Sequence, residues 1–226
     1  MRPPRARREK PRVSAFTSAD IPKILDLEPD LVLTFSDLQA DIAAALIRQG
    51  VDVHAFNQRT IAEILDMIRT LGSLVDAQDR AKRLTDDLVV ATTNARRRAS
   101  RLPFRPKVYF EEWDDPMISG IAWVSELIEA AGGSDIFADR AAGKSAKERI
   151  VTAADVIARA PDVIVGSWCG KKFRPEKVIA RPGFERVPAV QRGALHEIKS
   201  PLILQPGPAA LTDGLAALAA IVAGAR

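Results

Sequence analysis

The side chains that could do chemistry gather in short polar stretches, each directly after an apolar run. Residues 111–116 and 167–172 form two such stretches, and residues 34–39 form a third. In a parallel α/β sheet the carboxyl ends of the strands share one edge, and ligands bind outside that edge. We therefore expect the candidate site at these stretches, with residues 57–59 and 201–205 near the same edges.

The acidic residues of the polar stretch 111–116 raise the question of paired carboxylates. Glu111, Glu112, Asp114 and Asp115 are close in sequence, as glycoside hydrolysis or metal binding would require. Neighbouring side chains of a strand point to opposite faces, so Glu111 and Glu112 cannot act as one pair. The sequence also has no glycine-rich phosphate loop, no Ser–His–Asp order and no zinc-protease motif. We expect no catalytic residue and no metal site.

Cys169 is the single cysteine, so the chain forms no internal disulfide and no cysteine-based zinc site. Lys171 and Lys172 follow it and could lower the pKa of its thiol. No histidine lies nearby in sequence to act as a base, so we expect Cys169 not to be a nucleophile.

Three large aromatic residues belong to the polar stretches, namely Phe35, Trp113 and Trp168. Acidic, hydroxyl and lysine side chains lie beside the two tryptophans, whereas a core tryptophan usually has apolar neighbours. Two interpretations stay open for Trp113 and Trp168, the wall of a cleft and the interior of a core. Trp123 lies in an amphipathic helical pattern and is predicted to be core.

The elements that position these stretches are arranged around one long helical segment. Residues 76–102 contain no proline or glycine, and their apolar residues recur every three or four positions, which predicts a helix of roughly 35–40 Å. On each side of it, in residues 24–33 and 156–165, a helix end, a Pro-Asp turn and a short apolar strand follow one another. The sequence therefore predicts two α/β lobes, residues 1–75 and 103–226, bridged by the helix 76–102.

Within the lobes, alternating strand and helix patterns predict parallel sheets with short connections. The expected strands are 31–35, 51–56, 107–113 and 163–168, with an edge strand at 194–198 and a weaker candidate at 13–16. The expected helices are 19–27 after Ser18, 37–47, 61–74 after Thr60, 120–131, 153–160 after Thr152, and 209–223.

The composition of the chain argues against nucleic-acid binding and against a membrane-spanning segment. The apolar fraction of 47% supports a real core, and the net charge of +4 comes largely from residues 1–12, which we expect to be extended or mobile. The remainder is close to neutral, so no nucleic-acid partner is expected. No apolar run is long enough to span a membrane, and no secretion signal follows the basic start, so a literal reading gives a cytoplasmic protein.

Three segments, residues 109–133, 161–175 and 200–208, resemble the substrate-binding proteins of ABC importers for cobalamin and iron–siderophores. The similarity runs from about residue 10 to the C-terminus. It implies the class III periplasmic-binding-protein fold, two α/β lobes with a ligand between them, a periplasmic location, a monomer and docking to a membrane permease. It also implies capture of cobalamin or a ferric chelate without catalysis and without a cofactor of the protein's own.

The resemblance implies that the polar stretches form the ligand-binding site. Phe35, Trp113 and Trp168 would cover a flat macrocycle or chelate. Ser36, Gln39, Asn57 and Lys171 would hydrogen-bond its periphery, with Glu112 beside them. A single stiff bridging helix implies that the lobes close little.

The sequence departs from the family pattern in two places. A strand, a helix and a further strand that open the family's first lobe are not found before residue 10. We therefore expect an incomplete, less stable first lobe. Two interpretations stay open: the true start lies upstream, which would place the protein in the periplasm, or the chain is a truncated and impaired receptor. The permease-docking glutamates are also replaced, by residues 40–41 and 204–205. The alternative interpretation is a cytoplasmic α/β enzyme or regulatory small-molecule-binding domain that uses residues 111–115.

Overall fold

The computed structural model describes residues 4–225 and divides the chain into two compact units, Met1–Gln58 (unit 1) and Arg59–Arg226 (unit 2). The division lies earlier than the expected lobe boundary at residue 75. The helix expected at 61–74 and the long helix after it both belong to unit 2. The long helix is therefore an integral part of one compact unit, because its apolar stripe packs against the other helices of that unit.

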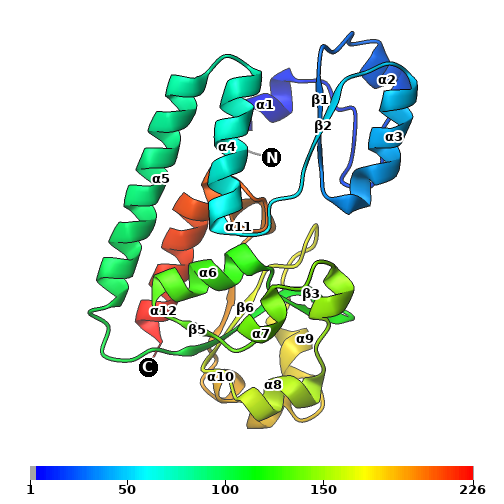
Figure 1. Ribbon diagram of the computed structural model, residues 1–226. Helices are drawn as coiled ribbons and strands as arrows, with labels where there is room; N and C mark the ends of the chain where they lie inside the picture. The colour runs from blue at the N-terminus through cyan, green and yellow to red at the C-terminus, as the bar shows by residue number, and fades with distance from the viewer. Residues whose placement is uncertain (1–3, 226) are drawn as a thin grey trace. The chain divides into compact units, whose positions relative to one another are not determined.

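Unit 1 is built on a parallel pair of strands, β1 (Val32–Phe35) and β2 (Val53–Phe56). Its helices are α1 (Pro4–Glu9), α2 (Ile21–Leu25), the short η1 (Asp37–Gln39) and α3 (Ala40–Arg48). The strand expected at 13–16 is reduced to one isolated bridge between Ser14 and Ala19. Figure 1 shows α3 beside the two strands, and the two-stranded sheet leaves much of unit 1 half-exposed.

The start of unit 1 differs from the sequence expectation in its local detail. The helix expected after Ser18 begins two residues later, because the Asp20 carboxylate accepts a hydrogen bond from the Lys23 backbone N–H at 3.1 Å. The N-terminal tail, expected to be extended, contains α1 in its described part, and residues 1–3 lie outside the described residues.

Unit 2 contains a five-stranded mixed sheet with the order β4-β3-β6-β7, in which β5 also pairs with β3. The strands are β3 (Lys107–Asp114), β4 (Met117–Ser119), β5 (Ser134–Asp135), β6 (Val163–Gly166) and β7 (Leu195–Glu197). Strands β5 and β6 run parallel to β3, β7 runs parallel to β6, and β4 is antiparallel. The edge strand predicted at 194–198 is confirmed as β7.

Helices cover both faces of this sheet. One face, with Val108 and Phe110, packs against α4 (Ile61–Leu74), α5 (Gln78–Ala99), α6 (Ala122–Ala131), α11 (Ser200–Ile203), η4 (Ala210–Gly214) and α12 (Leu215–Gly224). The other, with Tyr109 and Ile164, packs against α8 (Ala153–Arg159), α9 (Pro175–Ile179), η3 (Phe184–Arg186) and α10 (Pro188–Gln191). The connection between β5 and α8 holds α7 (Ala138–Ala141) and η2 (Ala146–Arg149).

The predicted helix ends in unit 2 are formed by the residues expected to form them. Thr60 with Glu63, and Thr152 with Asp155, make reciprocal capping boxes at the starts of α4 and α8. Gly132 ends α6 in the left-handed conformation with φ +93°. These ends follow from local hydrogen bonding, which is why the sequence alone locates them.

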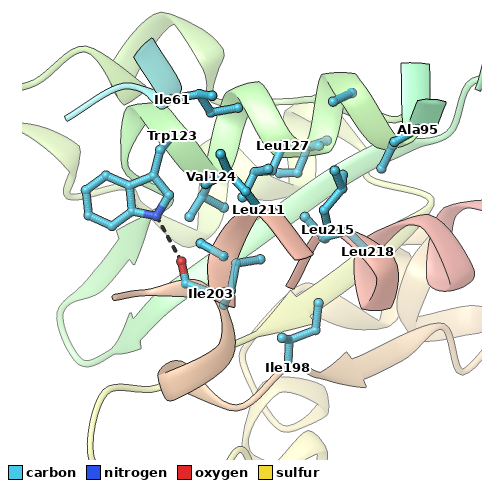
Figure 2. Packing of buried hydrophobic residues seen from close by; sticks show 14 of the residues in the cluster. Ile61, Ala95, Trp123, Val124, Leu127, Ile198, Ile203, Leu211, Leu215 and Leu218 are labelled. Carbon is cyan, nitrogen blue, oxygen red and sulfur yellow. Dashed lines mark hydrogen bonds between the residues drawn. The ribbon is translucent and has the colours of Figure 1, made fainter. Parts of the chain in front are cut away.

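The core prediction for Trp123 is confirmed in Figure 2. Its indole ring is buried between α6 and the segment of α11, and its Nε1 donates to the Ile203 carbonyl oxygen at 2.8 Å. On α5 the buried stripe includes Thr85 and Thr92, whose hydroxyls donate to carbonyls of the preceding turn. No helix within residues 4–225 is long and apolar enough to cross a membrane.

Candidate functional site

The candidate site in unit 2 lies where β3 and β6 end side by side; we call residues 111–115 and 167–173 the unit 2 rim. Glu111 pairs with Gly166 of β6, and the register of β3 against β4 shifts between Glu111 and Trp113. This irregularity redirects the side chains of the last residues of β3. The rim thus joins two strands that are distant in sequence, since the paired residues Glu111 and Gly166 are 55 residues apart.

Glu111 is the centre of a fully buried hydrogen-bond network, with a relative exposure of 0%. Its Oε1 accepts from the Trp168 indole N–H at 2.9 Å and from Arg181 Nη2 at 3.0 Å. Its Oε2 accepts from the Tyr109 hydroxyl at 2.9 Å and from Arg181 Nη1 at 2.5 Å. A carboxylate bonded on both oxygens by a bidentate arginine and two further donors is held in one orientation.

The charges in this network follow from its burial. Burial alone would lower the pKa of Arg181, but its hydrogen bonds to Glu111 and the negative charge there outweigh burial and raise it. Burial raises the pKa of Tyr109 well above its usual value, and the neighbouring Glu111 charge raises it further. Arg181 is therefore a permanent cation, and Tyr109 a permanent hydrogen donor, over any physiological pH.

Glu112 has a different arginine partner from Glu111, as expected for neighbouring residues of a strand whose side chains point to opposite faces. The buried Arg149 donates from Nη1 to Glu112 Oε2 at 2.5 Å and from Nη2 to Oε1 at 3.3 Å. Arg149 also donates to the Ser119 carbonyl oxygen of β4. Through Glu112 and Ser119, Arg149 ties the ends of β3 and β4 to η2.

Lys171 connects the two tryptophans of the unit 2 rim. Its ammonium lies 3.8 Å from the ring centroid of Trp113 and 5.6 Å from that of Trp168, and it forms an ion pair with Asp114. Burial would raise the pKa of Asp114, but the Lys171 hydrogen bond, a backbone hydrogen bond and the nearby ammonium groups lower it overall. The Trp113 indole N–H donates to the Asp115 carbonyl oxygen at 2.9 Å. Trp113 is thus a half-buried aromatic surface held from two sides.

Trp168 does not line an open cleft, so this expectation is corrected. Its side chain is 2% exposed and packs edge to face against Phe173, with ring centroids 5.1 Å apart. A Cβ atom at Gly166 would overlap the Phe173 ring, so the glycine makes room for this packing. The polar neighbours that suggested a cleft serve instead to satisfy the indole N–H, through Glu111.

The expected site residues of unit 1 mostly bond their own backbone. Gln39 Oε1 accepts from the Phe35 N–H at 2.7 Å and its Nε2 donates to the Phe16 carbonyl oxygen at 2.8 Å, so its amide is a clamp within unit 1 and not a free ligand group. Ser36 Oγ accepts from the Leu38 N–H at 3.2 Å as the N-cap of η1. Phe35 is half-buried with its ring 6.3 Å from Phe16.

Asn57 and Cys169 are the remaining residues that the sequence analysis considered. Asn57 is exposed and directly follows β2. The pKa of the Cys169 thiol is raised, by desolvation and by the charge of Glu112, so the lowering that the adjacent lysines could have produced does not occur. A thiol with a raised pKa is a poor nucleophile.

Sequence analysis missed Tyr109, Arg149 and Arg181, which fix the orientation of the rim. Arg181 is 70 residues from Glu111, and Arg149 is 37 residues from Glu112. No spacing rule joins residues so far apart. The only available signal was that a buried glutamate needs a cationic partner.

Solved structures with this architecture show which fold the chain has. A periplasmic heme-binding protein from Roseiflexus sp. RS-1 superposes with a TM-score of 0.80 at 23% identity, covering 98% of this chain and 87% of that chain. The periplasmic vitamin B12 binding protein of Vibrio cholerae gives a TM-score of 0.72 at 23% identity, covering 98% of this chain and 84% of that chain. The fold is that of the class III periplasmic binding proteins.

A family model described as periplasmic binding protein matches residues 2–202, and the chain belongs to this family. A vitamin B12-binding protein of Vibrio cholerae serotype O1 is 30% identical over 142 residues, which are 61% of this chain and 50% of the relative. The matched region thus spans about half the length of that relative.

Proposed function

We propose that this chain is the substrate-binding component of an ABC importer, which captures cobalamin or a related metal chelate and delivers it to a membrane permease. It would work outside the inner membrane and without catalysis. The observation that carries the proposal is the half-buried Trp113, fixed at the unit 2 rim with Lys171 over its ring. Relatives with the same fold are named for binding vitamin B12 and heme, which are flat macrocycles.

The rim has the mixture of groups that such a ligand needs. The Trp113 ring offers a flat apolar surface, and contact with it is worth on the order of 1–3 kcal/mol. Lys171 is 40% exposed and retains donors for a carboxylate or amide at the ligand's periphery. Glu112 of unit 2 is a further ligand contact that we propose. The residues Phe35, Ser36 and Asn57 of unit 1 remain predicted ligand contacts.

The network beneath the rim supports binding by keeping these groups in place before the ligand arrives. Arg181 donates both to Glu111 and to the Asp114 backbone carbonyl oxygen, and Asp114 in turn holds Lys171. Immobilising a flexible lysine costs entropy, so a lysine already held in place increases affinity.

The enzyme alternative has less support. Glu111, Glu112 and Asp114 are the acidic groups it would use, and each is engaged by an arginine or a lysine. A carboxylate so engaged is poorly placed to exchange protons with a substrate. Detection of turnover, or a metal requirement, would favour this alternative.

Calorimetric titration of the whole chain with cobalamin, hemin and a ferric siderophore tests the proposal. We expect one of these to bind, and Trp113→Ala to weaken it roughly tenfold to hundredfold, as the loss of 1–3 kcal/mol implies. Phe104→Ala, which removes another exposed aromatic ring of unit 2, should leave the affinity unchanged. If none of the chelates binds, the proposed function is wrong; if Trp113→Ala binds as well as the wild type, the assigned residue is wrong.

A further inference from the structure

The C-terminal end of α5 carries a dense group of positive charges that the proposed ligand site does not use. Five arginines fall within ten residues, and all of them are exposed: Arg96, Arg97, Arg98, Arg101 and Arg105. With the exposed apolar residues Val90 and Phe104 we call this surface the arginine end. It lies at the lower end of α5 in Figure 1.

Helix capping does not account for these arginines. Cationic side chains often follow helices to bond the last free carbonyl oxygens. Here the carbonyl oxygens of Arg96 and Arg98 accept from the backbone N–H groups of Ser100 and Arg101, at 3.0 and 3.1 Å. The Arg97 carbonyl oxygen accepts from the Ser100 hydroxyl at 2.9 Å. The helix end is closed by its own backbone and by one serine.

Ion pairing within the protein does not account for them either. Arg105 is engaged, since it pairs with Glu129 and its Nε donates to the Gly133 carbonyl oxygen at 3.0 Å. Within residues 4–225, none of the ion pairs of this structure involves the guanidinium groups of residues 96–98 or 101. Four positive charges therefore repel one another at one helix end, where the helix dipole offsets only about half a charge.

The geometry places these charges together on one surface. At about 100° per residue, Arg97, Arg98 and Arg101 lie within an arc of about 100° of the helix. Val90, which is 57% exposed, lies on the same arc, and Phe104 just beyond the helix is 47% exposed. Gly132 of α6 packs against Ala99 and Leu102, which fixes the end of the helix in place.

We propose that the arginine end binds the surface of a bilayer that contains anionic phospholipids. Guanidinium groups bind phosphate oxygens through paired N–H donors, and basic residues near such a surface are attracted by its negative potential. Exposed valine and phenylalanine side chains among the arginines fit the boundary between headgroups and acyl chains. Four exposed guanidinium groups spread along one helix end can each contact a different phosphate, which suits an extended anionic surface better than a small soluble anion. The proposal does not depend on the identity of the chelate.

Vesicle co-sedimentation of the whole chain tests the proposal. The wild type should bind vesicles of phosphatidylcholine with phosphatidylglycerol, should not bind phosphatidylcholine alone, and should dissociate as salt is added. The variant Arg96→Gln, Arg97→Gln, Arg98→Gln, Arg101→Gln should bind at least about tenfold more weakly. The corresponding four-lysine variant keeps the charge and should retain most of the binding.

The N-terminal tail supplies a matched control, because Arg5, Arg8, Lys10 and Arg12 are also exposed. Their replacement by glutamine removes the same net charge and should reduce binding less than the α5 variant does. The proposal is overturned if the tail variant loses more binding, if the lysine variant loses as much as the glutamine variant, or if the wild type binds both kinds of vesicle equally. Binding of heparin without binding of anionic vesicles would also overturn it.

Discussion

Strands β1 and β6 follow the same sequence signature, a Pro-Asp pair and then an apolar run, yet they lie in different surroundings. Every residue of β6 is buried, because helices cover both faces of its sheet and strands flank it on both sides. In β1 only Thr34 is buried, and Leu33 is exposed. The difference teaches that the local pattern determines that a strand forms, whereas the number of covering layers determines how firmly the residues after it are held.

The two polar stretches that follow these strands are stabilised differently. After β6, Trp168 is fixed by Glu111 and Arg181, partners distant in sequence. After β1, Ser36 and Gln39 bond backbone groups within unit 1. We therefore expect substitutions at the unit 2 rim to destabilise a whole unit and those in unit 1 to act locally.

The largest expected effect is that of Arg181→Ala. It leaves the Glu111 carboxylate buried without its cationic partner, which should lower the free energy of unfolding of unit 2 by about 3 kcal/mol. Urea denaturation followed by tryptophan fluorescence measures this loss. Arg69→Ala, which breaks an exposed pair with Asp66, should cost less than about 1 kcal/mol. Equal losses in the two variants would contradict the distinction.

A smaller and more local effect is expected for Gln39→Ala. It removes the hydrogen bonds to the Phe35 N–H and the Phe16 carbonyl oxygen, at a cost of about 1 kcal/mol. Hydrogen exchange should quicken for the amides of β1 and stay unchanged for those of β3 and β6. Faster exchange throughout unit 2 would show that the clamp is not confined to unit 1.

The smallest effect concerns the pH dependence of the Asp114–Lys171 pair. The pKa of Asp114 is lowered in the folded protein, so the pair stabilises the fold above the ordinary aspartate pKa of about 3.9 and is lost as the pH falls through the folded value. Protonation releases Lys171 from the Trp113 ring, and tryptophan fluorescence should change in that acidic range. Asp114→Asn should lack this change; an identical transition in the variant would assign it to another group.

The sequence predicted the parts of this structure that depend on local interactions. Thr60, Thr152 and Gly132 end their helices through neighbours in sequence, and the apolar runs of β1, β2, β3 and β6 suffice to locate the strands. The family resemblance, carried by residues 109–133, 161–175 and 200–208, supplied the class of protein.

The sequence predictions were wrong where contacts between residues distant in sequence determine the environment of a side chain. Trp168 has polar neighbours in sequence, but its environment is set by Glu111 and Phe173. Gln39 looked like a ligand group because its two backbone partners could not be identified from spacing. The predicted lobe boundary after residue 75 differs from the division after Gln58, because α4 packs against α5. A helical pattern in the sequence does not reveal this packing.

The central claim is that the unit 2 rim binds a metal chelate, and hydrogen exchange of the whole chain with and without saturating cobalamin tests it most directly. Binding at Trp113 and Lys171 should slow exchange in residues 113–117 and 168–173, because ligand contact restricts opening of the loops that carry these side chains. Exchange in α12, which packs against α5 and α6 and not against the rim, should not change. If cobalamin binds and neither rim segment slows, the ligand is bound elsewhere and the account of the rim is wrong.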